Sequence, residues 1–280
     1  MKVIILAGGK TNLPGKLKNI PKSLIEINGR PLLEYQLELL KKYRLNDIRL
    51  CLHYGASEIL KYLKKKDKKP KPTGKKGKVA GIEYIIDPKP LGTGGAIRNA
   101  AKDLKKDFIV INGDVLTNVN LSAYIKFYKK NISESRHFSL PPISKIPSVK
   151  IPMLLKKRVP FEDVLGAMAV FYTQDTADLG LVKVKNDRVV EFTEKPDYQY
   201  SGYINAGFYI LSPQIFQNKY FKSQKLAKLF NIEDIIFPEL AEKSQLLAYV
   251  HRGLWTDIGS EKGLEKTGTI IEKLEEKEEK

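Results

Sequence analysis

Residues Val3 to Lys10 read VIILAGGK, and the architecture of the chain can be worked out from this stretch. A short apolar run that ends in two glycines is typical of a parallel strand buried on both faces and followed by a sharp turn. Gly8 and Gly9 lack a Cβ, so their N–H groups can gather around an anion. Lys22, which follows Pro21, adds a cation. The stretch therefore indicates a polyphosphate site, although a plain connection between two elements remains an alternative.

Length and composition indicate a globular protein. With 280 residues, 42% of them hydrophobic, the chain suits one large α/β domain or such a domain with an appendage. No run reaches the roughly 18 apolar residues of a membrane span, and the apolar stretch before Gly8 is too short for a secretory signal. The single cysteine, Cys51, fits a reducing compartment and the interior of a strand. We therefore expect a cytoplasmic protein with no membrane partner.

The net charge of +17 raises the question of nucleic-acid binding. Much of the excess comes from KKKDKKPKPTGKKGK, residues 64–78, whose prolines and glycines predict an exposed loop. No aromatic residue is interleaved there for base stacking. We therefore expect no nucleic-acid partner; attraction of anionic substrates is the second interpretation of this charge.

Apolar strand-like runs alternate with helical patterns through the first 111 residues. This order predicts a parallel sheet with helices on both faces, and ligands at the carboxyl edge of its strands. The expected strands are Val3–Leu6, Ile48–Leu52, Ile82–Ile86 and Phe108–Ile111, and the expected helices are Leu32–Tyr43, Ala56–Lys65 and Gly94–Leu104.

The sequence pattern changes between residues 131 and 160. Five prolines there interrupt any helix and predict an inserted loop or flap. A regular pattern then resumes to about residue 260. Residues 1–260 are expected to form the main domain, and residues 261–280 a Lys/Glu-rich helical tail that docks on the body or pairs with another subunit. The later elements are strands at Gly166–Tyr172, Leu181–Val184, Arg188–Phe192, Phe208–Leu211 and Leu246–Val250, and a helix at Ile232–Leu240.

Two carboxylates stand in positions that suit a metal ion. Asp114 follows an apolar strand in VINGDVL, and Asp257 lies in LWTDIGS about half a chain later. Mg²⁺ takes few carboxylates and fills its other positions with water and phosphate oxygens. Each aspartate alone would pass for a turn residue. Together with the glycine turn, they favour a Mg²⁺ site.

Other polar residues stand out by their context. Proline flanks Lys22 and Lys195 and stiffens the backbone that aims each cation. Glu194 and Asn205 could hydrogen-bond to hydroxyl groups. The run Thr93 to Ala96 leaves room for a flat base or a phosphate, but equally fits a tight strand–helix connection. With no Ser, Cys or His nucleophile pattern in the sequence, metal, lysines and positioning would carry the chemistry, as in phosphoryl or nucleotidyl transfer.

In their order, the motifs LGTGGA, INGD, EKP, NAG and WTDIG resemble those of the sugar-phosphate nucleotidyltransferases, which make NDP-sugars from an NTP and a sugar 1-phosphate. The resemblance runs from Met1 to about Ser260, and the stretches NGRPLLEYQLELL and PLGTGGAI resemble the mannose- or heptose-1-phosphate guanylyltransferase branch. It implies a Rossmann-like nucleotidyltransferase fold, with a mixed, mostly parallel sheet flanked by helices and a Pro-rich insertion. A homo-oligomer is possible.

The resemblance also implies a role for each matching residue. Lys22 would steady the NTP phosphates, and Asp114 and Asp257 would hold Mg²⁺. Lys195 would bind the sugar phosphate. The nucleotide would contact Leu6, Ala7, Gly8, Gly9, Gly92 and Thr93, and the sugar pocket would include Gly180, Glu194 and Asn205.

The glycine loop departs from the family pattern G-G-x-G-T-R-L. Here it reads Gly8-Gly9-Lys10-Thr11-Asn12-Leu13, one residue shorter, without the third glycine and with Asn12 in place of the arginine. A neutral Asn cannot supply the arginine's charge or its forked donors to the leaving pyrophosphate. A catalytically weakened homologue that binds nucleotide or NDP-sugar and regulates a partner is therefore the alternative to an active enzyme.

Overall fold

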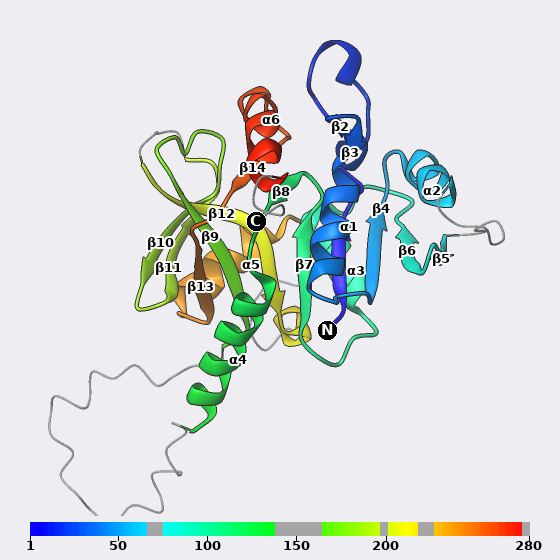
Figure 1. Cartoon of the computed structure of the whole chain (residues 1–280). Helices are drawn as coiled ribbons and strands as arrows, with labels where there is room; N and C mark the ends of the chain where they lie inside the picture. Colours follow the sequence, from blue (N-terminus) through cyan, green and yellow to red (C-terminus); the bar gives the residue numbers. More distant parts are fainter. Residues whose placement is uncertain (66–74, 138–163, 197–200, 218–226, 276–280) are drawn as a thin grey trace, which may run out of the picture.

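A ten-stranded sheet runs through the centre of the computed structural model of the chain (Figure 1). The structure describes residues 1–65, 75–137, 164–196, 201–217 and 227–275. The strands of this sheet are β1 (Val3–Leu6), β4 (Ile48–Leu52), β5 (Lys76–Val79), β6 (Ile82–Ile86), β7 (Phe108–Asn112), β9 (Gly166–Thr173), β10 (Leu181–Lys185), β11 (Arg188–Thr193), β12 (Gly202–Leu211) and β13 (Leu246–His251).

Strand direction follows from the pairing. The order across the sheet is β10-β11-β13-β9-β12-β7-β1-β4-β6-β5. β1 pairs in parallel with β4 and β7, β4 pairs in parallel with β6, and β13 pairs in parallel with β9. β5, β11 and β12 run against the other strands. The expected mixed sheet is therefore confirmed, with seven of its ten strands running in one direction and three against them.

Apolar side chains point alternately to the two faces of the sheet along each strand, which explains why helices cover both faces. Val3 and Ile5 belong to an apolar core with α1, α2 and α4, whereas Ile4, between them, belongs to the core with α3 and α5. No helix within the described ranges is long and apolar enough to cross a membrane. The helices are α1 (Leu32–Lys42), α2 (Ala56–Lys65), α3 (Gly92–Ala101), α4 (Leu121–His137), α5 (Ile232–Glu242) and α6 (Glu261–Glu275), with short 3-10 turns η1 (Gly15–Leu17), η2 (Lys22–Leu24) and η5 (Pro213–Phe216).

Two small sheets lie beside the large one. β8 (Val115–Thr117) pairs antiparallel with β14 (Trp255–Asp257), and β2 (Glu26–Ile27) pairs with β3 (Arg30–Pro31). β8 follows β7 directly, whereas β14 comes from near the end of the chain. This pairing brings the segment that carries Asp257 to the segment that carries Asp114.

Several expected boundaries were wrong. Helix α4 was not expected, and it continues to His137, into the region assigned to the Pro-rich insertion. It can do so because the first proline of that region is Pro141; the rest of the insertion lies outside the described residues. The basic segment 64–78 is not all loop: its first two residues end α2, and residues 76–78 belong to β5. Helix α3 begins at Gly92, two residues earlier than expected.

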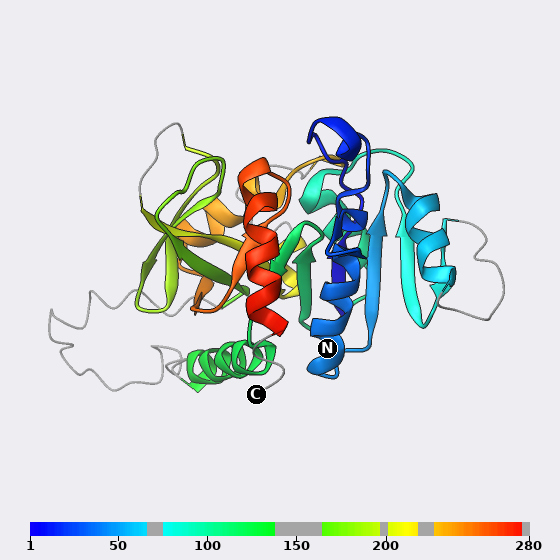
Figure 2. The same ribbon diagram turned by 45° about the horizontal axis from the view of Figure 1, so that its top comes forward.

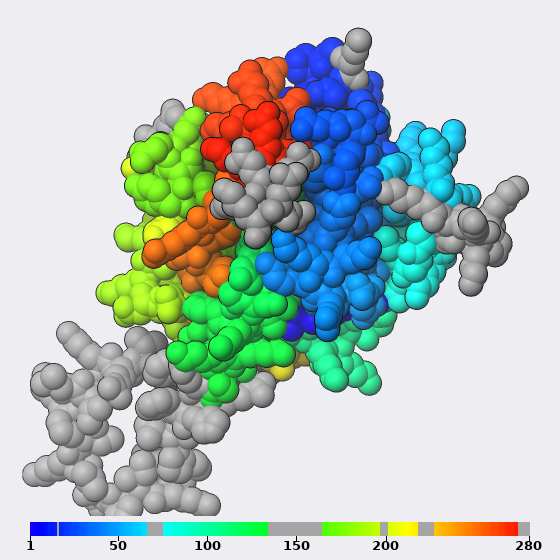
Figure 3. Space-filling model, viewed as in Figure 1, coloured from blue at the N-terminus to red at the C-terminus, as the bar shows by residue number. Residues whose placement is uncertain are grey.

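Helix α6 docks on the body of the protein. Figure 2 shows it, in red, between the antiparallel part of the sheet and the N-terminal segment, and Figure 3 shows its surface against blue N-terminal atoms. Ile271 is fully buried in an apolar cluster with Leu13, Ile25 and Leu32. Of the two expectations for the tail, docking on the same chain is the one the structure has.

We expect Ile271→Ala to lower the free energy of unfolding by about 2–4 kcal/mol, because it leaves a cavity in this cluster. Thr269→Ala, at an exposed position of the same helix, is the control and should change it by less than about 0.5 kcal/mol. Urea denaturation at two protein concentrations measures both. Equal stability of the two variants, or a loss seen only on dilution, would mean that α6 packs against another subunit.

Candidate active site

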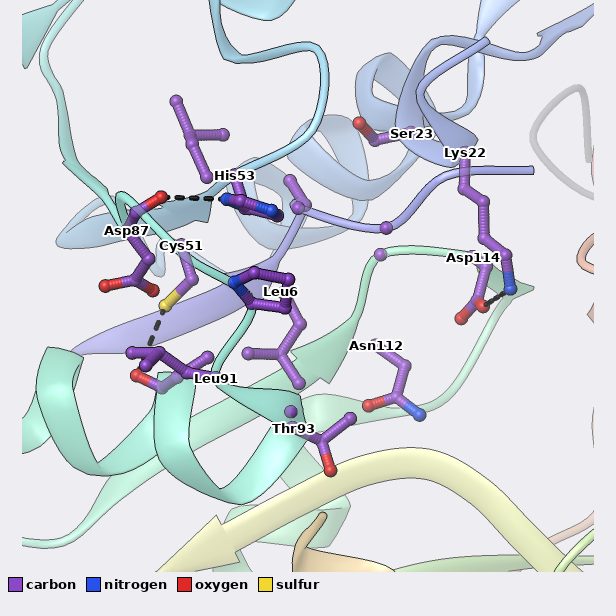
Figure 4. Close-up of a pocket in the computed structure, with 18 of the residues that line it drawn as sticks. Leu6, Lys22, Ser23, Cys51, His53, Asp87, Leu91, Thr93, Asn112 and Asp114 are labelled. Carbon is purple, nitrogen blue, oxygen red and sulfur yellow. Dashed lines mark hydrogen bonds and ion pairs between the residues drawn. The ribbon is translucent and has the colours of Figure 1, made fainter. Parts of the chain in front are cut away.

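A cavity of about 350 Å³ opens where β1, β4, β6 and β7 end (Figure 4). Their parallel pairing places the carboxyl ends of these strands at one edge, the usual ligand position in such sheets. Lys22 and Asp114 also line the cavity. The structure brings together all six residues expected to contact nucleotide: Leu6, Ala7, Gly8, Gly9, Gly92 and Thr93.

The Gly8-Gly9 turn runs close to the next strand. A Cβ at Gly8 would lie 2.9 Å from the backbone nitrogen of His53, nearer than side chains approach. At Gly9 a Cβ would meet the Lys22 side chain at 3.5 Å, and the Lys22 N–H donates to the Gly9 carbonyl at 3.0 Å. The turn therefore holds Lys22 beside the glycines, as the sequence predicted.

Lys22 and Asp114, which line the cavity, converge with Asp257, which lies beside it. Lys22 Nζ donates to Asp114 Oδ2 at 2.7 Å (Figure 4). The Ile258 N–H donates to the Asp114 carbonyl at 2.9 Å, and the Gly259 N–H donates to Asp257 Oδ1 at 2.6 Å. Two carboxylates that are far apart in sequence thus lie around one ammonium group.

Charge and burial perturb these groups. Burial and the nearby charge of Asp114 raise the pKa of Asp257 to about 6, against the Gly259 hydrogen bond and the charge of Lys22. Burial lowers the pKa of Lys22, but the charge of Asp114 and the hydrogen bond to it outweigh burial and leave that pKa raised. Two partly buried carboxylates close together favour a cation between them.

The same three groups crowd around Gly259. A Cβ at Gly259 would lie 2.7 Å from Lys22 Nζ, 2.9 Å from Asp257 Oδ1 and 3.5 Å from Asp114 Oδ2, so only glycine lets this backbone come so close to the ammonium and both carboxylates. Carboxylate oxygens suit Mg²⁺. Among the described residues, no group of three or more His, Cys, Asp or Glu could hold a metal. Any ion here would take its remaining ligands from water and substrate.

The residues expected to bind the sugar phosphate lie on the antiparallel side of the sheet. The Asn205 N–H donates to the Gly180 carbonyl at 2.8 Å, and a Cβ at Gly180 would lie 2.7 Å from Glu194 Oε2. Burial raises the pKa of Glu194, opposed by the charge of Lys195. The charge of Lys195 also acts on Asp257. Lys195 is therefore near enough to Asp257 for its charge to act on that carboxylate.

Asn112 connects the two groups. It lines the cavity, and its Nδ2 lies 3.5 Å from the hydroxyl of Tyr209, which also accepts a hydrogen bond from Asn205 Nδ2 at 2.8 Å. Within the described ranges, Asn112 Oδ1 and the hydroxyl of Ser23, another lining residue, are buried without a hydrogen-bond partner. Unpaired polar atoms in a cavity wall are the groups that a polar ligand would satisfy.

Asp87 was missed in the sequence. It follows β6, is 5% exposed and lines the cavity. Its Oδ1 accepts from Asn99 Nδ2 at 2.6 Å, and its carbonyl accepts from His53 Nδ1 at 2.8 Å. Burial raises its pKa, opposed first by the Asn99 hydrogen bond. Its place after a strand of the parallel set was the available signal. His53, for which the sequence suggested no role, is part of the same wall.

A second missed group forms the far wall. Phe230 donates its N–H to the Leu91 carbonyl at 3.0 Å and accepts from the Gly95 N–H at 3.2 Å. Asn231 lines the cavity, and its Oδ1 accepts from the Thr93 N–H at 3.3 Å. Cβ atoms at positions 92, 94 and 95 would collide with residues 228–231. The glycines of LGTGGA therefore make room for this segment of the protein, and a tight connection explains part of that motif.

Comparison with known proteins identifies the family of this chain. The sequence matches the nucleotidyl transferase family over residues 2–141 and 153–273. It is 27% identical over 278 residues to the mannose-1-phosphate guanyltransferase of Aspergillus fumigatus, covering 97% of this chain and 64% of that relative. The chain thus spans somewhat less than two thirds of that relative's length.

Solved structures share the fold. HddC from Yersinia pseudotuberculosis superposes with a TM-score of 0.69 at 27% identity, covering 96% of this chain and 99% of that one. A putative glucose-1-phosphate thymidylyltransferase from Bacillus anthracis superposes with a TM-score of 0.70 at 19% identity, covering 96% and 94%, which supports the fold alone. With most of its length matched, this chain belongs to the nucleotidyl transferase family.

Proposed function

We propose that the protein transfers a nucleotidyl group from an NTP to a sugar 1-phosphate, giving an NDP-sugar and pyrophosphate. The observation that carries the proposal is the convergence of Lys22, Asp114 and Asp257 beside a cavity whose lining includes the glycine turn and the start of α3. Glu194 and Lys195 continue this site on the antiparallel side. Such a layout can hold a nucleotide and a sugar phosphate at the same time.

The position of each group supports a particular role in the proposed reaction. The N–H groups of the Gly8-Gly9 turn and the ammonium of Lys22 would bind the NTP phosphates. Lys195 would bind the sugar phosphate, and Glu194 and Asn205 would accept hydrogen bonds from, or donate them to, sugar hydroxyls. A phosphate oxygen of the sugar would then attack the α-phosphorus in line, and pyrophosphate would leave. An anionic nucleophile of this kind needs positioning rather than a general base.

Asp114 and Asp257 would hold Mg²⁺ through their carboxylate oxygens. When bound, the ion would neutralise charge on the phosphates. Lys22 is already paired with Asp114 at 2.7 Å, so it would share that carboxylate with the ion. Its ammonium could turn toward the phosphates once the ion is present.

For the base we propose guanine, and for the sugar a mannose- or heptose-type 1-phosphate. Asp87 supports guanine, because a carboxylate only accepts hydrogen bonds and guanine presents N1–H and the N2 amino group side by side. Adenine has an acceptor at N1. Relatives named as mannose-1-phosphate guanyltransferases, and a structure of HddC complexed with GMP-PN, support the same base.

The alternative is a weakened homologue that binds nucleotide or NDP-sugar and regulates a partner. One observation favours it: the loop position held by arginine in the family is the exposed, neutral Asn12. Lys10, also exposed, lies 5.4 Å from the ring centroid of Tyr54 and is a cation close to the turn. The rate of pyrophosphate release decides whether the charge of Lys10 replaces that of the missing arginine.

The test is pyrophosphate release with Mg²⁺, with GTP, ATP, UTP, CTP and dTTP each crossed with a panel of sugar 1-phosphates. Turnover with GTP and a mannose- or heptose-type sugar supports the proposal in full. Turnover with another pair of substrates would support the proposed reaction but contradict the proposed base or sugar. Nucleotide binding without turnover, unrelieved when Asn12→Arg restores the missing charge, would favour the regulatory alternative.

Asp114→Asn and Asp257→Asn should each lower kcat by roughly 100-fold or more, because each removes a charged oxygen ligand at the reacting phosphates. The folded structure should persist, since the amide keeps the shape of the carboxylate. Steady-state kinetics with thermal melting as a check measures this. Asp47→Asn, at an exposed carboxylate paired with Lys2, is the matched control. Activity near wild type in both Asp114→Asn and Asp257→Asn would remove the proposed metal site.

Asp87→Asn should reduce the preference for GTP over ATP in kcat/KM by about tenfold or more, because the amide presents one acceptor where the carboxylate presents two. Its hydrogen bond to Asn99 can persist through the remaining oxygen, so stability should change little. Asp47→Asn again serves as the control. An unchanged GTP/ATP ratio would show that the base is read elsewhere.

A further inference from the structure

Glu233 is a buried acid that the proposed reaction does not use. It lies in the first turn of α5 and is 8% exposed. Its Oε2 accepts a hydrogen bond from the hydroxyl of Thr93, in the first turn of α3. The Thr93 hydroxyl in turn accepts from the Ile232 N–H at 3.0 Å. One threonine thus joins the starts of two helices, with Glu233 as its acceptor.

The junction also fixes the backbone of the cavity wall. The Thr93 N–H and Gly95 N–H, which an isolated helix start would leave unpaired, bond to Asn231 and Phe230. Thr93 and Asn231 both line the cavity. A change at Glu233 would therefore reach the ligand space through Thr93, without Glu233 itself lying in the lining.

We propose that Glu233 is a positioning residue for the nucleotide, which holds Thr93 and the first turn of α3 in place as one wall of the cavity. The inference rests on the proposed function for the identity of the ligand. It assigns to the start of α5 a role that no motif in the sequence indicated.

The surroundings of Glu233 show that its position is maintained against an electrostatic cost. Burial raises its pKa to about 7, against the Thr93 hydrogen bond, and the charges of Glu194 and Asp234 add to that rise. Tyr209 is the other titratable group that interacts with it, and Lys195 partly offsets the charge of Glu194. An apolar side chain would avoid this cost but could not bind Thr93.

The experiment compares nucleotide binding by calorimetry, without sugar phosphate, in wild type, Thr93→Val, Glu233→Leu and the double variant. Each single change removes one partner of the bond and should raise the Kd for GTP about tenfold, the value of one hydrogen bond to a charged group. The double variant should lose no more than either single one, because both act through the same bond. Glu239→Leu is the control: Glu239 lies on the same helix but pairs with Lys243.

A further variant separates the effect of the charge of Glu233 from the effect of its shape. Glu233→Gln keeps an acceptor for Thr93, so its Kd should stay near wild type. The folded-state pKa of Glu233 lies above its unfolded value, so wild type loses stability as pH rises toward about 7, and Glu233→Gln does not. The melting temperatures of the two should be similar at pH 5, and Glu233→Gln should be the more stable at pH 8.

The outcomes distinguish the two proposals. If wild type binds none of the five NTPs, the proposed function fails. If wild type binds GTP, and folded Thr93→Val and Glu233→Leu bind it equally well, this inference fails and Glu233 is only structural. If Glu233→Leu does not fold, Glu233→Met takes its place, because it also removes the acceptor of the Thr93 hydroxyl. Thr93→Val alone does not decide, since Thr93 itself lines the cavity.

Discussion

The close approach of Asp114, Asp257 and Lys22 is the constraint on which the rest of the structure depends. Two partly buried carboxylates that lie close together repel each other, and burial reduces the screening by water. The Lys22 ammonium, 2.7 Å from Asp114, offsets part of that repulsion. Burial, and after it the charge of Asp114, nevertheless raise the pKa of Asp257. A site with residual negative charge of this kind favours a further cation, and thus the substrates that bring one.

Several contacts exist to hold this unfavourable cluster together. Gln36, buried in α1, donates from its amide to the carbonyls of Asn112 and Val115, both at 2.9 Å, and so fixes the turn that carries Asp114. β14 pairs with β8 and sets Asp257 opposite Val115. The first turn of α6 then packs on Asp257, since the Thr256 hydroxyl donates to the Gly263 carbonyl at 2.9 Å. The C-terminal helix is in this way part of the framework that positions Asp257.

The elements that could be predicted from the sequence are those with a clear hydrophobic period or a strong motif. The apolar runs of β1, β4, β6 and β7 identified the parallel half of the sheet, and with it the edge where the glycine turn and Asp114 meet. β8 and β14, of three residues each, are too short to show any period, although they bring Asp257 into place. Glu233 reads as an ordinary charged residue in a helix start, because its partner Thr93 is 140 positions away. Contacts of that separation leave no local trace in a single sequence.

The two glycine turns also show how little a sequence motif says about three-dimensional contacts. A glycine in a motif indicates that something approaches the backbone closely, but not what approaches it. At LGTGGA the close neighbour is the segment 228–231, which also takes up the N–H groups of Thr93 and Gly95. At Gly9 the nearest neighbour is the flexible end of Lys22. Gly8 is crowded by the backbone of His53, so Gly9 is the glycine of the first turn that the protein itself crowds least. The start of α3, in contrast, serves as a wall whose position depends on α5.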